Sequence, residues 1–256
     1  MALLAVIALA VLVVGCFRVY RHFFPVIPPT AAQEVRDATA TARAVTSASA
    51  HFTTQVSGLT VMFGTVSEQV TRTTRLATLR MTSVDGADRF AVTEVVTPAK
   101  VYVSMPSLAA AVGKPWLAVP VPQLGADPAM AQLYQTGALP TVEAALLGTA
   151  STARLAGTST VRGVQVSRYV GTIDPATALA ALSPEMHQLL APELAATTGA
   201  IRFTAWIDAR HNLREVETSA TVGGRLTVTT VVVTAFNRPV RIAVPLASQV
   251  AAMGAG

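Results

Sequence analysis

The only cysteine of the 256-residue chain, Cys16, lies at the end of an apolar run that begins at Met1. The thiol follows the tripeptide Val-Val-Gly, and residues 1–17 carry no charged side chain. A cysteine after a small residue is a candidate for acylation, as in the signal of a bacterial lipoprotein. The alternative is an inert thiol, because free cysteine packs as a small hydrophobic group. We favour acylation because the cysteine is unique and falls where the apolar run ends.

The leader around this cysteine has three interpretations. It is a cleavable secretory signal, a lipoprotein signal, or an uncleaved helix, since 17 residues span about 25 Å of a bilayer core of roughly 30 Å. Arg18 and Arg21 would then lie at the membrane surface. No lysine or arginine precedes the apolar run, and bulky Phe17 and Arg18 follow the cysteine where lipoproteins usually have small polar residues. All three interpretations therefore stay open.

Catalytic and metal-binding patterns are absent from the sequence. It has no G-x-S-x-G motif, no P-loop and no G-x-G-x-x-G motif after a strand. None of the four histidines shares a metal-ligand spacing with a cysteine or a carboxylate cluster, so each is expected to be a surface or capping residue; they are His22, His51, His187 and His211. Asp208 lies close to Trp206 in a predicted strand, and an ion pair with an arginine explains it best. We therefore expect no enzyme activity, no metal and no cofactor.

The net charge of +5 comes from dispersed arginines, with only two lysines. Aromatic residues make up 5% of the chain, so neither a basic run nor a stacking platform for nucleic acid is present. We expect the arginines to lie on solvated strand faces and the protein not to bind nucleic acid.

Periodicity predicts an α+β fold, an antiparallel sheet with helices on one side; the curvature of a half-barrel is implied only by the family resemblance described below. A helix is expected from Thr30 to about residues 47–51, and a hairpin over 55–66 with bends at Gly58 and Gly64. Two helical regions open at Asp-Pro pairs, near 127–150 and 174–198. The remaining predicted strands are 76–82, 89–96, 100–105, 116–119, 152–161, 164–173, 201–208, 214–222, 225–236 and 240–244.

Small apolar residues on the strands leave space between the sheet and its helices. This pattern fits an apolar cavity, and it fits equally well a core of alanine and valine that arises from GC-rich coding bias. The residues in question are Ala77, Ala91, Ala205 and Ala220.

Three segments resemble the LppX/LprA/LprF/LprG-type actinobacterial lipoproteins. The segment 100–116, KVYVSMPSLAAAVGKPW, is similar to their Tyr-x-x-Met-Pro … Gly-Lys-x-Trp pattern, and 163–174, GVQVSRYVGTID, to Gly-Val-x-x-x-x-Tyr-x-Gly-Thr-x-Asp. Trp206-Ile-Asp208 with Leu213-Arg214 resembles their Trp-x-Asp … Leu-x-Arg hairpin. Each motif alone is weak, but together with an ending that resembles theirs around 238–245 they spread over most of the chain.

The resemblance implies a half-barrel like that of the LolA/LolB lipoprotein carriers, with an apolar cavity that accepts acyl chains. We expect a monomer that binds an acyl lipid or glycolipid and is tethered to the extracytoplasmic side of the cell membrane by acylated Cys16 or by the leader helix. The expected domains are a signal or anchor (1–24), a Pro-rich linker (25–33), a lipid-binding domain (34–246) and a flexible tail (247–256). Candidate cavity residues are Val101, Val103, Leu179, Met186, Leu189, Phe203 and Ile207. The alternative is a structural or interaction lipoprotein with a solid core and no ligand.

Overall fold

The computed structural model describes residues 30–71, 75–121 and 139–252. The chain divides into two units, Met1–Thr30 and Ala31–Gly256, and the helices and strands of the structure belong to the second. Cys16 and the predicted helical stretch 127–138 lie outside the described residues. Within the described residues, no helix combines the length and the hydropathy needed to cross a bilayer.

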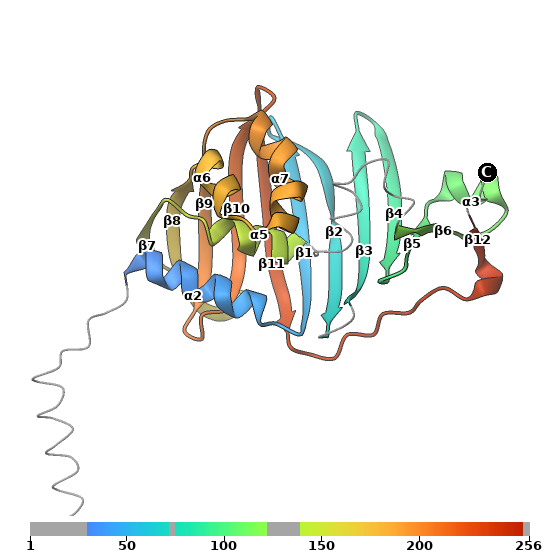
Figure 1. The fold of residues 1–256 in the computed structure, drawn as a ribbon, viewed down its shortest axis with the longest axis horizontal. Helices are drawn as coiled ribbons and strands as arrows, with labels where there is room; N and C mark the ends of the chain where they lie inside the picture. Colours follow the sequence, from blue (N-terminus) through green and yellow to red (C-terminus); the bar gives the residue numbers. More distant parts are fainter. Residues whose placement is uncertain (1–29, 72–74, 122–138, 253–256) are drawn as a thin grey trace, which may run out of the picture. The chain divides into compact units, whose positions relative to one another are not determined.

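Twelve strands of the described residues form one open sheet (Figure 1). Its spatial order is β12-β6-β5-β4-β3-β2-β1-β11-β10-β9-β8-β7, and all neighbours are antiparallel except β12 and β6. The predicted α+β class with a curved, unclosed antiparallel sheet is confirmed. The strands are β1 Ser47–Val56, β2 Leu59–Val70, β3 Arg75–Asp85, β4 Asp88–Val96, β5 Lys100–Ser104, β6 Trp116–Pro120, β7 Thr152–Val161, β8 Val164–Ile173, β9 Thr197–Asp208, β10 Leu213–Val222, β11 Arg225–Phe236 and β12 Val250–Ala252.

Helices lie on one face of this sheet, which we call the helix face; the opposite face is the outer face. Figure 1 shows α2, α5, α6 and α7 in front of β7–β11 and β1, while β2–β6 extend beyond them and α3 lies beside β6. The helices are α2 Ala31–Arg43, α3 Pro106–Val112, α5 Leu139–Leu147, α6 Pro175–Ala181 and α7 Pro184–Ala196.

Local sequence signals explain where α6 and α7 begin. The Asp174 carboxylate accepts a hydrogen bond from the Thr177 N–H, and the Ser183 hydroxyl accepts one from the Met186 N–H, each ahead of a proline in the first turn. The capped start predicted at Asp174 is confirmed.

The first helix is shorter than predicted. It ends at Arg43, and Ser47 already begins β1, which pairs with β2 on one side and with β11 on the other. Strand pairing over two sides outweighs the helical preference of the alanine- and serine-rich segment after Arg43.

The main core forms where α2, α5, α6 and α7 meet the helix face. One cross-strand row of directly paired residues runs Ala205, Val216, Val231, Phe52. All four are buried, with Val231 fully so. Because the residues of both core clusters lie after Ala31, the segment 31–256 contains the whole described core.

Three other predictions fail near turns and ends. Gly64 is not a bend but lies inside β2, and residues 240–244 form no strand. The predicted flexible tail does not hold for 247–252, where a 3₁₀ turn leads into β12. The edge of β6 offers unpaired backbone groups to β12, and Lys114 Nζ donates a hydrogen bond to the Ser248 carbonyl, so this segment is fixed.

Alanine in place of Gly64 is expected to destabilise the domain by about 1–3 kcal/mol. A Cβ there would meet the Phe52 ring at 2.9 Å and would also collide with the Arg80 carbonyl oxygen. The measurement is denaturant unfolding, with Thr65→Ala at the next position as the control. Equal denaturation midpoints for the Gly64→Ala and Thr65→Ala variants would contradict the steric reason for glycine at position 64.

Candidate functional site

The predicted ligand residues fall into two groups in the structure. Met186, Phe203 and Ile207 are buried members of the main core cluster, and Leu179 packs against it. Val101 is fully buried in a second, smaller cluster, against which Val103 packs. Leu189 belongs to α7, but its side chain is outside the described part of the structure.

A small apolar pocket adjoins the main core, lined by residues that the structure describes. The apolar pocket beneath α2, between Val45 and Phe236, has a volume of about 20 Å³, close to the smallest space that holds one water molecule. An acyl chain therefore does not fit in this pocket as the structure stands.

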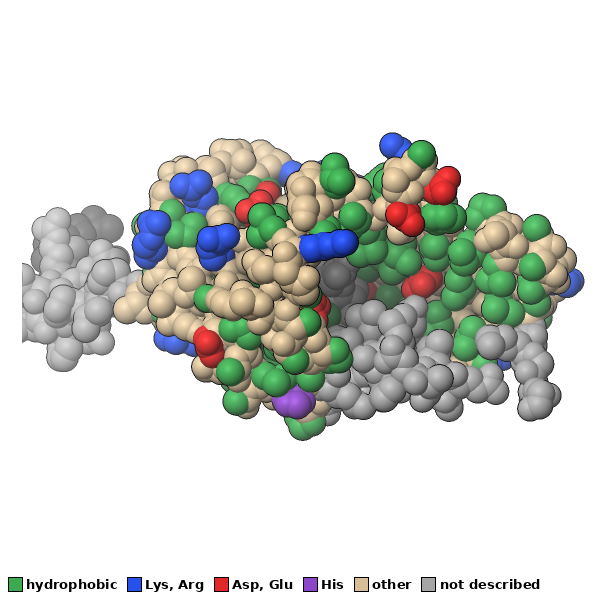
Figure 2. Space-filling model, turned by 90° about the horizontal axis from the view of Figure 1, so that it is seen from above, with side chains coloured by type: hydrophobic (Ala, Val, Ile, Leu, Met, Phe, Trp, Pro, Cys, Tyr) green, Lys and Arg blue, Asp and Glu red, His purple; other side chains and the backbone are tan. Residues whose placement is uncertain are grey.

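A second apolar area lies on the helix face of β3–β6, and we call it the apolar surface. Directly paired residues Leu79, Glu94, Val103 and Leu117 form one row across it. The three apolar members of this row are half-buried. Figure 2 shows hydrophobic side chains gathered over this half of the domain, with acidic side chains among them. The apolar residues on this face are Ala77, Leu79, Met81, Val92, Val96, Val101, Val103, Leu117 and Val119. Four of them are already buried in the structure, namely Ala77, Val96, Val101 and Val119, and the other five are half-buried.

The apolar surface is continuous with the main core. Met62, Leu79 and Met81 of β2 and β3 pack against the core cluster while sharing the face of the apolar surface. Its acidic members, Glu68 and Glu94, are 5% and 7% exposed and both take part in polar or electrostatic contacts. The arrangement can shelter an apolar chain alongside strands β3–β5.

A buried carboxyl group lies in the helix layer, on α5. Glu143, the only charged residue of α5, is 8% exposed, and its Oε2 has no hydrogen-bond partner among the residues that the structure describes. Burial, reinforced by the charge of Glu193 on α7, raises the pKa of Glu143 to about 8 although Thr218 hydrogen-bonds to it. Glu143 is therefore protonated at neutral pH. Its position within the otherwise apolar sequence of α5 was the available sequence signal, and the prediction missed it.

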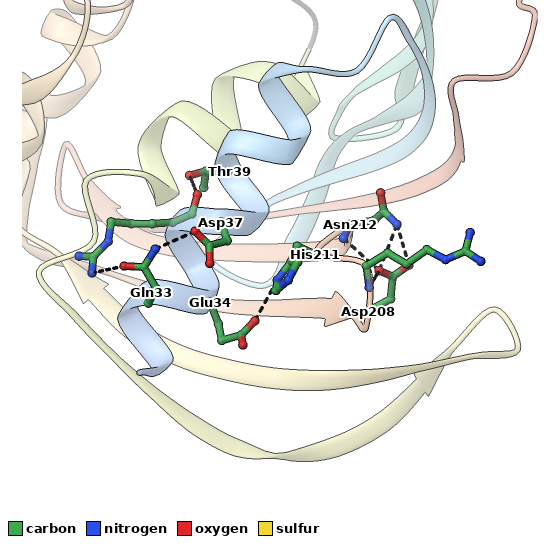
Figure 3. Close-up of polar contacts among 9 residues, drawn as sticks. Gln33, Glu34, Asp37, Thr39, Asp208, His211 and Asn212 are labelled. Atoms are coloured by element: carbon green, nitrogen blue, oxygen red, sulfur yellow. Dashed lines mark hydrogen bonds and ion pairs between the residues drawn. The ribbon is translucent and has the colours of Figure 1, made fainter. Parts of the chain in front are cut away.

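The turn between β9 and β10 is held by Asp208 (Figure 3). Its carboxylate accepts hydrogen bonds from Asn212, from the Arg210 N–H and from Arg214, whose Nη2 lies 2.6 Å away. Burial alone would raise the pKa of Asp208, but these hydrogen bonds together hold it below its ordinary value. The predicted ion pair between Asp208 and an arginine is confirmed, and its role is structural.

His211 in the same turn connects it to α2. Its backbone has a φ of 57°, a left-handed conformation that histidine adopts more readily than most residues, and its Nδ1 lies 3.0 Å from Glu34 Oε2 (Figure 3). Because the two residues are distant in sequence, spacing rules could not reveal this contact. The described residues contain no group of three or more metal-ligating side chains.

Comparison with solved structures identifies the fold. LprF from Mycobacterium bovis is 17% identical, with a TM-score of 0.54 over 84% of this chain and 96% of its own. The Mycobacterium tuberculosis lipoprotein LppX is 19% identical, with a TM-score of 0.54 over 85% of this chain and 100% of its own. The chain has the fold of LppX and LprF. No family model and no curated protein matches the sequence.

This likeness extends over the whole length of LppX, so the LppX fold accounts for both halves of the sheet. The half-barrel expected from the sequence resemblance is confirmed. At these identities the comparison establishes the fold and not the ligand.

Proposed function

We propose that the chain is a member of the LppX/LprF-type lipoproteins and binds or transfers an acyl lipid or glycolipid on the extracytoplasmic side of the cell membrane. It acts as a monomer without enzymatic chemistry or a cofactor. Residues 1–24 export and tether it, 25–33 form a linker, and the domain carries the ligand. The observation that supports this most is the apolar surface on the helix face, continuous with the core.

The binding chemistry is burial of hydrocarbon. Each CH₂ group taken from water contributes about 0.8 kcal/mol, so ten such groups contribute about 8 kcal/mol before the costs of ordering the chain. Val101 and Val103 would contact the chain along β5. The core residues on the helix side, Leu179, Met186, Leu189, Phe203 and Ile207, would form its inner wall where α6 and α7 adjust to admit it.

Extraction of bound lipid tests this function. The segment 31–256, which contains the described core, would be expressed in a bacterial host and purified without detergent. An organic extract of the purified protein would then be examined by mass spectrometry. Stoichiometric lipid, together with uptake of a fluorescent fatty acid, is the expected result. An empty extract and no uptake would contradict the proposal.

The alternative is a structural or interaction lipoprotein without a ligand. The small volume of the pocket beneath α2 favours it, because a closely packed core has no room for a chain. The same extraction separates the two functions, since this alternative predicts neither bound lipid nor fatty-acid uptake.

Alanine in place of Cys16 is expected to release the full-length protein from the membrane fraction, because we propose that its acyl chains hold the protein there. Membrane fractionation followed by immunoblotting measures this, with an alanine at Val13 as the control. Full retention of the Cys16→Ala variant would assign the anchor to the leader helix.

A further inference from the structure

A hollow lined by described residues lies on the outer face of the sheet, away from the apolar surface. It has a volume of about 540 Å³ and spans strands β7 to β10. This size is within the usual range for small-molecule sites. Its polar lining includes two arginines, a glutamate and several hydroxyl groups: Arg154, Arg202, Glu217, Thr172, Thr204 and Ser219.

Strand register brings these side chains together. Arg154, Val170, Thr204 and Glu217 form one row of directly paired residues. The next row is Thr152, Thr172, Arg202 and Ser219, at the same pairing positions two residues further along. Both rows alternate with the buried helix-face residues, so their side chains project from the outer face.

The two arginines lie on either side of β8. Because neighbouring strands are about 4.8 Å apart, the backbones of β7 and β9 are separated by roughly 10 Å, a distance that two arginine side chains can close around one small group. Within the described residues, neither guanidinium takes part in a hydrogen bond or an ion pair. Both guanidinium groups are therefore available to bind a ligand.

The charge of the hollow indicates which ligand it suits. Two guanidinium groups and the Glu217 carboxylate give a net charge of +1, which matches a singly charged group better than a dianion. Guanidinium forks recognise the oxygens of phosphates in bidentate geometry. Thr204 and Ser219 add hydroxyl donors between them, while the hydroxyls of Thr152 and Thr172 already bond to each other at 2.8 Å.

We propose that this outer hollow binds a phosphodiester group between Arg154 and Arg202, with the Thr204 and Ser219 hydroxyls as additional donors. Glu217 disfavours a second negative charge in the hollow. Phospholipid headgroups and soluble phosphodiesters share this chemistry, and the test distinguishes them. The site is separate from the apolar surface, so it binds independently of the lipid-carrying function proposed above.

The test compares the segment 31–256 with an Arg154→Gln/Arg202→Gln variant. Binding of soluble glycerophosphoglycerol is measured by calorimetry, and binding to phosphatidylglycerol vesicles by sedimentation. The control is Arg162→Gln/Arg225→Gln, which removes the same charge from the turn between β7 and β8 and from the start of β11, both outside the hollow. We expect the first variant to lose at least ten-fold in affinity, the control to lose less than three-fold, and fatty-acid uptake to be unchanged in both.

Each outcome decides the proposal. Loss of soluble-ligand and vesicle binding in the Arg154/Arg202 variant alone supports a site for free phosphodiesters as well as headgroups. Loss of vesicle binding alone, with no soluble binding by any protein, assigns the site to headgroups in a membrane. Equal losses in the two variants would show only non-specific charge attraction and overturn it, as would absence of binding to both probes.

Discussion

Glutamine in place of Glu143 is expected to stabilise the domain by a few kcal/mol at pH 8.5 and by much less at pH 5. The folded protein keeps a proton on Glu143 up to a pKa of about 8, whereas the unfolded chain releases it near 4.5. Between these values the folded state binds more protons, so the free energy of unfolding falls as the pH rises. The interval from 4.5 to about 8 corresponds to at most about 5 kcal/mol. Glutamine removes the ionisation while keeping the size of the side chain.

Denaturant unfolding at the two pH values measures this difference. The control is Asp88→Asn in the exposed start of β4, which we expect to change the free energy of unfolding by less than about 0.5 kcal/mol at either pH. If the free energy of unfolding changed with pH in the same way for the wild-type and Glu143→Gln proteins, the prediction would be wrong, because ionisation of Glu143 would then not destabilise the folded state.

Aspartate in place of Val103 is expected to reduce fatty-acid uptake by at least ten-fold. Val103 is half-buried on the apolar surface and directly opposite Glu94 in the β4–β5 pair. A bound acyl chain would remove water from a carboxylate at this position, which is unfavourable, and the neighbouring glutamate would repel the carboxylate. The effect is measured as the affinity of the Val103→Asp variant for a fluorescent fatty acid, compared with that of the wild-type protein.

The matched control is Ser104→Asp, which places the same charge on the outer face of β5 one residue later. Circular dichroism confirms that both variants keep the sheet. Equal fatty-acid uptake by the two variants would show that the ligand does not bind along β5. A further variant, Val103→Ser, separates the effect of the charge from the effect of the lost packing.

Much of the fold was predictable because its signals are local. The strands over 152–161 and 164–173 alternate around a turn at Arg162 and Gly163, and both appear at the predicted bounds. The capped start at Asp174 is equally local. The helix after Thr30 was overextended because nothing near Ser47 shows that β11, almost two hundred residues later, pairs with it.

The candidate site was less predictable because it depends on long-range register. Ala77 and Ala205 suggested space between helices and sheet, yet Ala205 is fully buried and the pocket beneath α2 has a volume of only about 20 Å³. Val101 and Val103 were predicted to line a cavity, and they share an apolar face, but their contact with a ligand stays a prediction. The outer hollow depends on Arg154 of β7 and Arg202 of β9 lying on the same face on either side of β8, which no spacing in the sequence indicates.

The pairing of β1 with β11 also governs how the domain folds. Strands β1–β5 and β7–β11 are each runs of neighbours in the sequence, joined in the sheet through the β1–β11 ladder. Such non-local pairing closes a large loop, and folding rates fall as the mean sequence separation of contacts rises. One side of β1 therefore stays unpaired until the last third of the chain is available. A chain that is synthesised from its amino terminus therefore exposes the unpaired backbone groups of one β1 edge for most of its synthesis. Such an edge can pair with other chains, so this topology requires protection from aggregation during synthesis.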